Sequence, residues 1–233
     1  MRRIPANRSK KLQTLKTCRY FDSVREEILI EISEGMKLLH FTRGEAVFWE
    51  NERSSGLYII EKGSVKLYKL SQQGRELVIE VFSNGDSFNE VPVFDGENNP
   101  VNVAALEESD IWVVDADSIR KSLYKYPDVT KAVVLNLSKN LRMLVTKIEE
   151  LSFYQVTNRL ARLIDNLPKE QLSGPSSVRL TRDELAARLG TVREVVTRSL
   201  KELERSGAIT VSRREIEIVD QDRLDTWTQI PCE

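Results

Sequence analysis

Residues that build metal and redox sites are scarce in this sequence. Its two cysteines, Cys18 and Cys232, lie near opposite ends of the 233 residues, and His40 is its one histidine. Two separated thiols exclude a disulfide scaffold, a zinc module of cysteine pairs and a four-thiolate iron–sulfur cluster. A single imidazole excludes any site that needs several histidines. We therefore expect no metal site and no iron–sulfur cluster.

Long apolar segments and enzyme motifs are also missing. No apolar run approaches the ~18 residues that a membrane helix needs. The sequence has no phosphate-binding loop, no nucleophile elbow and no zinc-protease motif. It therefore predicts a cytoplasmic protein that is not an enzyme and has no membrane partner.

The charges nearly cancel, with 35 basic and 36 acidic side chains, but they are unevenly placed. Residues 1–21 contain seven Lys or Arg and no acid, which predicts a loose basic N-terminal arm over residues 1–19. Between Arg179 and Arg214, nine basic residues face five acids, a local charge of +4. A local basic patch of this kind suits a phosphate backbone.

Glycines divide the first half of the chain into short β-rich runs. Seven of the ten lie between Gly35 and Gly96, mostly 11 or 12 residues apart. This spacing predicts an antiparallel β-barrel or jelly roll over residues 20–126, with a covering helix at Phe21–Ile32. The predicted strands are Ala46–Trp49, Leu57–Ile60, Ser64–Leu70, Leu77–Phe82, Val101–Leu106 and Ile111–Val114. We expect seven aromatic residues to form its core: Trp49, Tyr58, Tyr68, Phe82, Phe88, Phe94 and Trp112.

After Pro127 the apolar spacing becomes helical. Apolar residues alternate at steps of three and four over about three heptads, which predicts a long helix at residues 127–152 with a coiled-coil seam. The seam residues are Val134, Leu137, Leu141, Leu144, Ile148 and Leu151. Such a seam needs a partner helix, so we expect a homodimer; the alternative is that it packs on its own β-domain. A second helix is predicted at Val156–Asn166, and a surface turn at Leu172–Ser177.

The segment that follows has the pattern of a winged helix-turn-helix, which we place within residues 153–233. Thr181 and Glu184 form a capping box that starts a helix at Arg182, and Gly190 ends it. A second helix is predicted from about Val192 to Gly207. Ile209–Val211 and Ile216–Val219 then predict a small hairpin around Ser212, Arg213 and Arg214.

The second of these helices has one polar outward face. Arg193, Glu194, Thr197, Arg198 and Lys201 share it, and N-terminal residues of such a helix reach base edges in the major groove. We expect DNA contacts from this face and from the neighbouring residues Thr181, Arg182 and Thr191. The alternative is a solvated helix held by surface ion pairs such as Glu194–Arg198.

The chain resembles transcription regulators of the cyclic-AMP receptor protein / fumarate-nitrate regulator (CRP/FNR) family from about Tyr20 to Val219. The resemblance lies in Phe41–Glu45, Leu57–Leu67, Gly85–Glu90, Phe153–Ala161 and Leu180–Ile209. It implies an α+β chain with a sensor barrel like a cyclic-nucleotide-binding domain, a dimerisation helix and a winged helix-turn-helix, in the same order as predicted above. It also implies RNA polymerase as a partner.

The resemblance implies how the DNA is read. Arg193, Glu194 and Arg198 coincide with the base-reading positions of the cyclic-AMP-receptor branch, which implies a palindromic site with TGTGA-like half-sites. The fumarate-nitrate branch has a non-Arg residue at position 193 and needs clustered N-terminal cysteines, whereas this chain has only Cys18 there.

The effector site departs from the family pattern. Glu90 keeps the carboxylate that binds ribose, but Asn89 replaces the family's Gly, and the phosphate-binding Arg falls on Asn99 or Pro100. Leu144 and Val145 replace the Thr-Ser pair that meets adenine, and no Lys or Arg lies between Phe82 and Ile119. Because a buried phosphate needs a cation, we predict that cyclic AMP is not the effector.

The sequence thus predicts a homodimeric, sequence-specific DNA-binding regulator that responds to an unidentified small molecule in its barrel. One alternative is a constitutive regulator whose barrel is only a dimer scaffold. Another is a haem-based sensor of NO or CO, with His40 as the haem ligand and Cys18 as a weaker candidate.

Overall fold

The computed structural model describes residues 2–175, 179–212 and 215–229. Contacts divide the chain into two compact units: residues 1–69 with 79–141, and residues 70–78 with 142–233. Ser176, Ser177, Arg213, Arg214 and Cys232, which the predictions above mention, lie outside the described residues.

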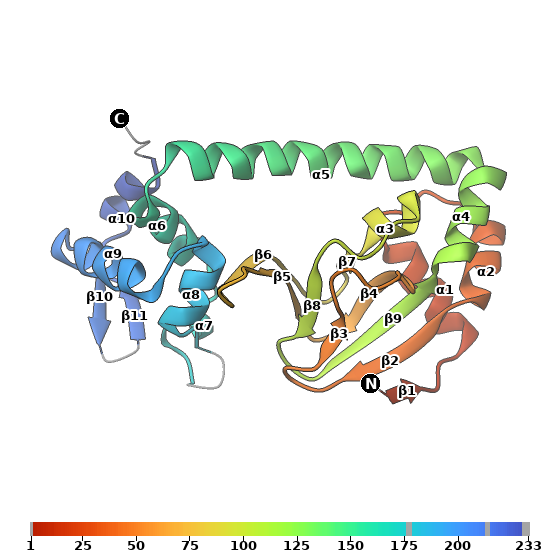
Figure 1. The fold of residues 1–233 in the computed structure, drawn as a ribbon, viewed down its shortest axis with the longest axis horizontal. Helices are drawn as coiled ribbons and strands as arrows, with labels where there is room; N and C mark the ends of the chain where they lie inside the picture. The colour runs from red at the N-terminus through yellow and green to blue at the C-terminus, as the bar shows by residue number, and fades with distance from the viewer. Residues whose placement is uncertain (1, 176–178, 213–214, 230–233) are drawn as a thin grey trace. The chain divides into compact units, whose positions relative to one another are not determined.

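The first unit contains two β-sheets, except that residues 70 and 76–78 of the second sheet are assigned to the second unit (Figure 1). Four of its strands pair with antiparallel registers in the order β2-β9-β4-β7: Lys37–Phe41, Ser109–Asp115, Gly56–Lys62 and Ser87–Phe88. The second sheet has the order β3-β8-β5-β6: Ala46–Phe48, Asn102–Ala105, Val65–Leu70 and Glu76–Phe82. The predicted antiparallel barrel is confirmed, and β2 and β7 are strands that the glycine spacing did not predict.

Alternating residues of the central strands serve two different cores. Tyr58 and Ile60 of β4 face the barrel interior, whereas Leu57 and Ile59 face the helices, because successive side chains of a strand point to opposite sides. Of the seven aromatic residues predicted for the barrel core, Trp112 and Phe94 belong to the helix-side core. The prediction is wrong for Trp49, which is not in the core. Its side chain is 49% exposed because Trp49 follows the last residue of β3 and is not covered by the sheet.

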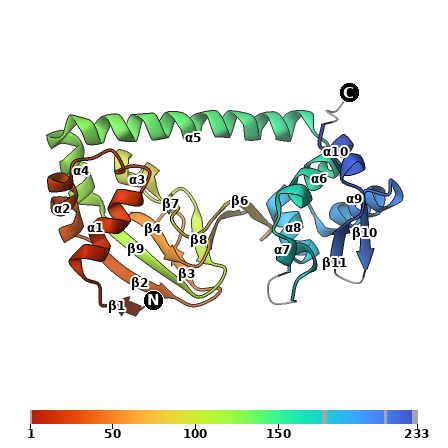
Figure 2. The same ribbon diagram turned by 180° about the vertical axis from the view of Figure 1, so that it is seen from behind.

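The predicted loose arm at residues 1–19 is wrong, because its described residues, 2–19, are folded as part of the first unit. Strand β1 (Arg2–Ile4) pairs with β2, and helix α1 (Arg8–Thr17) packs beside α2 (Glu26–Glu34) (Figure 2). Leu15 and Cys18 are fully buried. Two of the basic residues have acidic partners elsewhere in the chain, Lys10 with Glu61 and Lys16 with Glu26, both at 2.8 Å.

The covering helix also differs from its prediction. It begins at Glu26 rather than Phe21, and residues 21–24 form turns in which the side chain of Phe21 fills the core. Two further helices of this unit, α3 (Glu90–Asp95) and α4 (Ala116–Lys125), were not predicted.

Helix α5 (Pro127–Phe153) matches the predicted long helix. Its first half buries Val129, Ala132, Val133 and Asn136. Of the six predicted seam residues, Leu137 packs partly against the core of its own unit, as the alternative had it. The other five, Val134, Leu141, Leu144, Ile148 and Leu151, are exposed in the single chain.

The second unit is mostly helical. Helices α6 (Val156–Asn166), α8 (Arg182–Leu189) and α9 (Arg193–Arg205) and strands β10 (Ile209–Ser212) and β11 (Glu215–Ile218) match the predicted elements within two residues. Helices α7 (Lys169–Ser173) and α10 (Gln221–Gln229) were not predicted. The predicted surface turn from Leu172 is wrong at its start, because Leu172 lies on α7 and is buried in the unit's core.

Candidate nucleic-acid interface and effector site

The turn between α8 and α9 is built as the sequence predicts. The Thr181 Oγ1 accepts a hydrogen bond from the backbone N–H of Glu184 at 3.2 Å. The Glu184 carboxylate accepts one from the backbone N–H of Thr181 at 2.7 Å. This capping box satisfies backbone donors at the start of α8. Gly190 ends the helix at φ 65°, a left-handed conformation that glycine adopts without steric cost. Thr191 follows in the turn and donates its backbone N–H to the Ala186 carbonyl.

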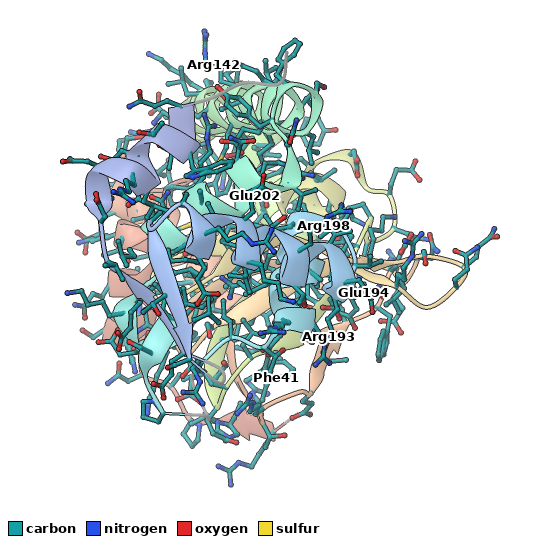
Figure 3. The ribbon with its side chains drawn as sticks, turned by 90° about the vertical axis from the view of Figure 1, so that its left-hand side faces the viewer. Phe41, Arg142, Arg193, Glu194, Arg198 and Glu202 are labelled. Atoms are coloured by element: carbon teal, nitrogen blue, oxygen red, sulfur yellow. The ribbon has the colours of Figure 1, made fainter. Side chains whose placement is uncertain are left out.

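Helix α9 buries one face and exposes the other. Val196, Leu200 and Leu203 pack into the unit's core. Arg193, Glu194, Arg198 and Lys201 are exposed, and Thr197 is half-buried with its hydroxyl donating to the Arg193 carbonyl at 2.9 Å. Figure 3 shows the side chains of Arg193, Glu194 and Arg198 close together along this helix. The structure therefore places these three predicted base-reading residues on one accessible surface.

The arginines on this surface differ in their partners. The Arg193 guanidinium pairs with Asp183 of α8 at 3.0 Å, and both side chains are more than half exposed. Arg182 donates to the Thr197 hydroxyl at 3.4 Å. Within the described residues, no ion pair joins Glu194 to Arg198. The alternative of a solvated helix held by surface ion pairs therefore lacks the pair that was predicted for it.

A pocket in the second unit collects several predicted DNA contacts. Arg179, Thr181, Arg182, Asp183 and Arg193 line it together with apolar residues of α9 and the hairpin. Arg179 is bound to Glu215 of β11 at 2.7 Å. Since Arg182 and Arg193 both line this pocket, the start of α8 and the start of α9 bring two guanidinium groups to one surface.

In the first unit, the two positions that depart from the phosphate-binding pattern bind each other. Asn89, at φ 71°, precedes α3, and its Nδ2 donates to the Asn99 Oδ1 at 3.2 Å, to the Ser54 Oγ and to the Gly56 carbonyl. Asn99 is buried and donates to the Trp49 carbonyl. Pro100 is exposed. Asn89 and Asn99 therefore hydrogen-bond to each other at the positions where the family resemblance implies phosphate-binding residues.

Glu90 is also held by side chains of the chain itself. The Asn140 Nδ2 of α5 donates to the Glu90 Oε1 at 2.8 Å and to the Tyr20 hydroxyl at 3.3 Å. Burial, together with the nearby Glu90 charge, raises the pKa of Tyr20. Sequence reasoning missed Tyr20 and Asn140. Leu144 and Val145, the other predicted pocket residues, are exposed on α5 in the second unit.

Arg19 and Arg120 are cations from outside residues 82–119 that contact this part of the first unit, and both have partners. Arg19 donates to the Ser87 carbonyl at 3.4 Å and lies 3.7 Å from the Asp86 carboxylate. Arg120 donates to the Val93 carbonyl and pairs with Asp117 at 2.6 Å. Neither guanidinium therefore replaces the missing phosphate-binding arginine without leaving these partners.

The candidate haem ligands do not fit haem iron. The His40 Nδ1 lies 2.7 Å from the Asp110 carboxylate and its Nε2 lies 2.9 Å from that of Glu108. The Asp110 carboxylate raises the pKa of His40, which favours an imidazolium without a lone pair for iron. Cys18 is fully buried, and burial raises the pKa of its thiol to about 11, so the thiolate form that binds metals is disfavoured.

The chain matches two family models. Residues 38–126 match the cyclic nucleotide-binding domain, and residues 158–227 match the Crp-like helix-turn-helix domain. Among the described residues, no helix combines the length and the apolar character needed to cross a membrane.

Relatives cover most of the chain. A CRP-like cAMP-activated global transcriptional regulator of Mycobacterium tuberculosis is 27% identical over 209 residues, which are 88% of this chain and 93% of that protein. The cyclic AMP receptor protein of Thermus thermophilus is 24% identical over 86% of this chain and 91% of its own length.

Solved structures share the fold. The c-di-GMP responsive global regulator CLP of Xanthomonas campestris has a TM-score of 0.69 at 22% identity, over 84% of this chain and all of that one. A transcriptional regulator of the CRP/FNR family from Thermus thermophilus has a TM-score of 0.67 at 23% identity, over 82% of this chain and 98% of that one. Two family models on its barrel and its helix-turn-helix, with relatives along most of its length, show that the chain belongs to the CRP/FNR family of DNA-binding transcription regulators.

Proposed function

We propose that this regulator acts as a homodimer that reads a palindromic DNA site with TGTGA-like half-sites. The observation that carries the proposal is the exposed set Arg193, Glu194 and Arg198 on α9, a helix whose opposite face is fixed in the core. In the major groove, Arg binds the O6 and N7 atoms of guanine, and Glu accepts from the N4 amino group of cytosine. The second unit therefore carries the sequence-reading activity.

The remaining polar residues serve the DNA backbone. Thr181, Arg182, Thr191, Thr197 and Lys201 flank the three base-reading positions and are at least partly exposed. Contacts to phosphates fix the register of a protein on DNA without reading sequence. We assign these five residues to phosphate contacts that orient α9 in the groove.

Dimerisation follows from the apolar surface of α5. Val134, Leu141, Leu144, Ile148 and Leu151 are exposed at coiled-coil spacing, and a contiguous apolar surface of this kind marks an interaction site. Two copies joined here place two reading helices on half-sites about one helical turn apart. The DNA-bound dimer then acts on RNA polymerase.

The experiment that tests this function is selection of binding sites from random DNA by the full chain. We expect a palindrome of TGTGA-like half-sites in the selected pool. A pool without two-fold symmetry would contradict the homodimer, and a pool without enriched sequence would contradict base reading by α9.

Cyclic AMP should neither bind tightly nor be needed for DNA binding. The Asn89–Asn99 pair occupies the phosphate positions, and Arg19 and Arg120 are held by their own carboxylates. Calorimetry should show no micromolar affinity for cyclic AMP, and DNA affinity should be the same with and without it. Micromolar binding would mean that a basic group moves into the site on binding.

A second candidate function is a constitutive regulator that binds DNA without an effector. The observation that favours it is that Asn89, Glu90 and Asn99 are bonded within the chain. The small-molecule effector expected from the sequence stays a prediction. Haem-based gas sensing has weaker support, because His40 and Cys18 do not fit haem iron.

A further inference from the structure

A short segment between α1 and α2 ties three elements of the first unit together. We call residues 18–22 the N-terminal strap. The Arg19 carbonyl accepts a hydrogen bond from the Asn136 Nδ2 at 2.7 Å, and the Tyr20 hydroxyl accepts one from the Asn140 Nδ2. Asn136 and Asn140 are four residues apart and therefore lie on one face of α5. The strap is thus bonded twice to the same face of the long helix.

The strap also contacts strand β7 and helix α3. The Arg19 guanidinium donates to the Ser87 carbonyl of β7. The fully buried Tyr20 ring packs edge-on against Phe94 of α3 with 5.7 Å between ring centroids. The Asn140 Nδ2 completes the link, because it donates both to the Tyr20 hydroxyl and to Glu90 at the start of α3. Backbone, ring and hydroxyl of the strap all take part.

Asn140 joins Tyr20 and Glu90 into one set of partners. Its Nδ2 donates both to the Tyr20 hydroxyl and to the Glu90 carboxylate. A hydrogen bond to a charged group is among the stronger ones in proteins, and leaving a buried partner unpaired costs more than the bond itself contributes. A ligand that used Glu90 as its acceptor would have to break this set first.

We propose that Tyr20 and Asn140 are positioning residues for DNA binding: through them the N-terminal strap joins α3 to α5 in the place of a bound small molecule. The chain is then competent to bind DNA without an effector, because α5 leads directly into the DNA-binding unit. This inference rests on the proposed function, since its readout is sequence-specific DNA binding.

Tyr20→Phe tests the link with the smallest change, because it removes the hydroxyl and keeps the buried ring. We expect affinity for the selected DNA site, measured without any added small molecule, to fall by about tenfold. Hydrogen exchange of α5 around Ala132–Leu141 should become faster. Tyr126→Phe is the matched control, because the Tyr126 hydroxyl also takes part in a side-chain hydrogen bond of the first unit, at 2.6 Å, but with Glu31 on α2. The control should keep the wild-type DNA affinity.

Asn140→Asp is the second variant and stands in if Tyr20→Phe does not fold. It keeps the size of the side chain but replaces the amide donor by a carboxylate facing Glu90. We expect a similar loss of DNA affinity, and no further loss when Tyr20→Phe is added, because both changes break the same link.

Three results would overturn the strap as a positioning device. The first is that both variants bind DNA as tightly as the wild type. The second is that they lose thermal stability and DNA affinity only to the extent that Tyr126→Phe does. The third is that the wild type binds its site only when a small molecule is added. A wild type that selects no specific DNA at all would instead contradict the proposed function, so the two failures are distinguishable.

Discussion

Leu144→Glu should convert the dimer to a monomer and abolish specific DNA binding at concentrations where the wild type binds. Leu144 lies near the middle of the exposed part of the α5 seam, between Leu141 and Ile148, and is 48% exposed in the single chain. In a symmetric dimer one substitution places a carboxylate in the interface from both copies. A charge buried without a partner costs several kcal/mol, and ~4 kcal/mol corresponds to about a thousandfold in the dimer dissociation constant.

Sedimentation velocity and binding to a full palindrome would measure the two effects. Leu135→Glu is the matched control: Leu135 is also a leucine on α5, and it is 54% exposed, but it lies outside the three-four spacing of the seam. The control should remain a dimer and bind DNA. If Leu144→Glu sediments as a dimer and binds normally, the seam is not the interface.

The elements that the sequence predicted best are those whose signals are local. The capping box of Thr181 and Glu184, the left-handed Gly190 and the apolar period of α9 all act within a few residues. Their positions in the chain therefore place the helix ends, and the face that points outward follows from the helical period. This is why Arg193, Glu194 and Arg198 could be placed on the outward face of α9 before the fold was known.

The elements that the sequence missed depend on partners far along the chain. Residues 1–19 looked like a solvated arm because the acid that pairs with Lys10 is Glu61, about fifty residues away. Tyr20, Glu90 and Asn140 are similarly separated, and only the packing of α3 and α5 brings them together. An Asn one helical turn before Leu144, a polar residue bordering the seam, was the available signal for this contact.

The three residues proposed to read bases should differ in how much specific DNA affinity each substitution costs. A bidentate Arg–guanine pair discriminates against a wrong base by ~1–3 kcal/mol in each half-site. Arg193 must leave Asp183 to make such a pair, and an exposed ion pair offsets at most about 1 kcal/mol of the gain. Arg198 has no ion-pair partner among the described residues. Arg198→Ala should therefore cost more specific affinity than Arg193→Ala.

Substitution of a residue assigned to a phosphate contact distinguishes positioning of the protein on DNA from reading of its bases. Arg182→Ala should weaken binding to specific and non-specific DNA alike and lower the salt dependence by about one contact per subunit. Arg198→Ala should instead weaken binding to the selected site far more than to random DNA, with the loss confined to one base pair of each half-site.

Glu194→Ala is the most discriminating of these changes, because it removes an anion from a surface that faces phosphates. Glu194 is exposed at the first turn of α9, so its loss leaves the core residues Val196 and Leu200 in place. Affinity for non-specific DNA should hold or rise, since a carboxylate near the DNA backbone is repelled by it. Glu194 is proposed to accept a hydrogen bond from the N4 amino group of a cytosine. Preference for that base pair should disappear in the variant, because alanine offers no acceptor. Site selection from random DNA with both proteins measures the two effects together, and identical selected sequences would mean that α9 does not read the groove through Glu194.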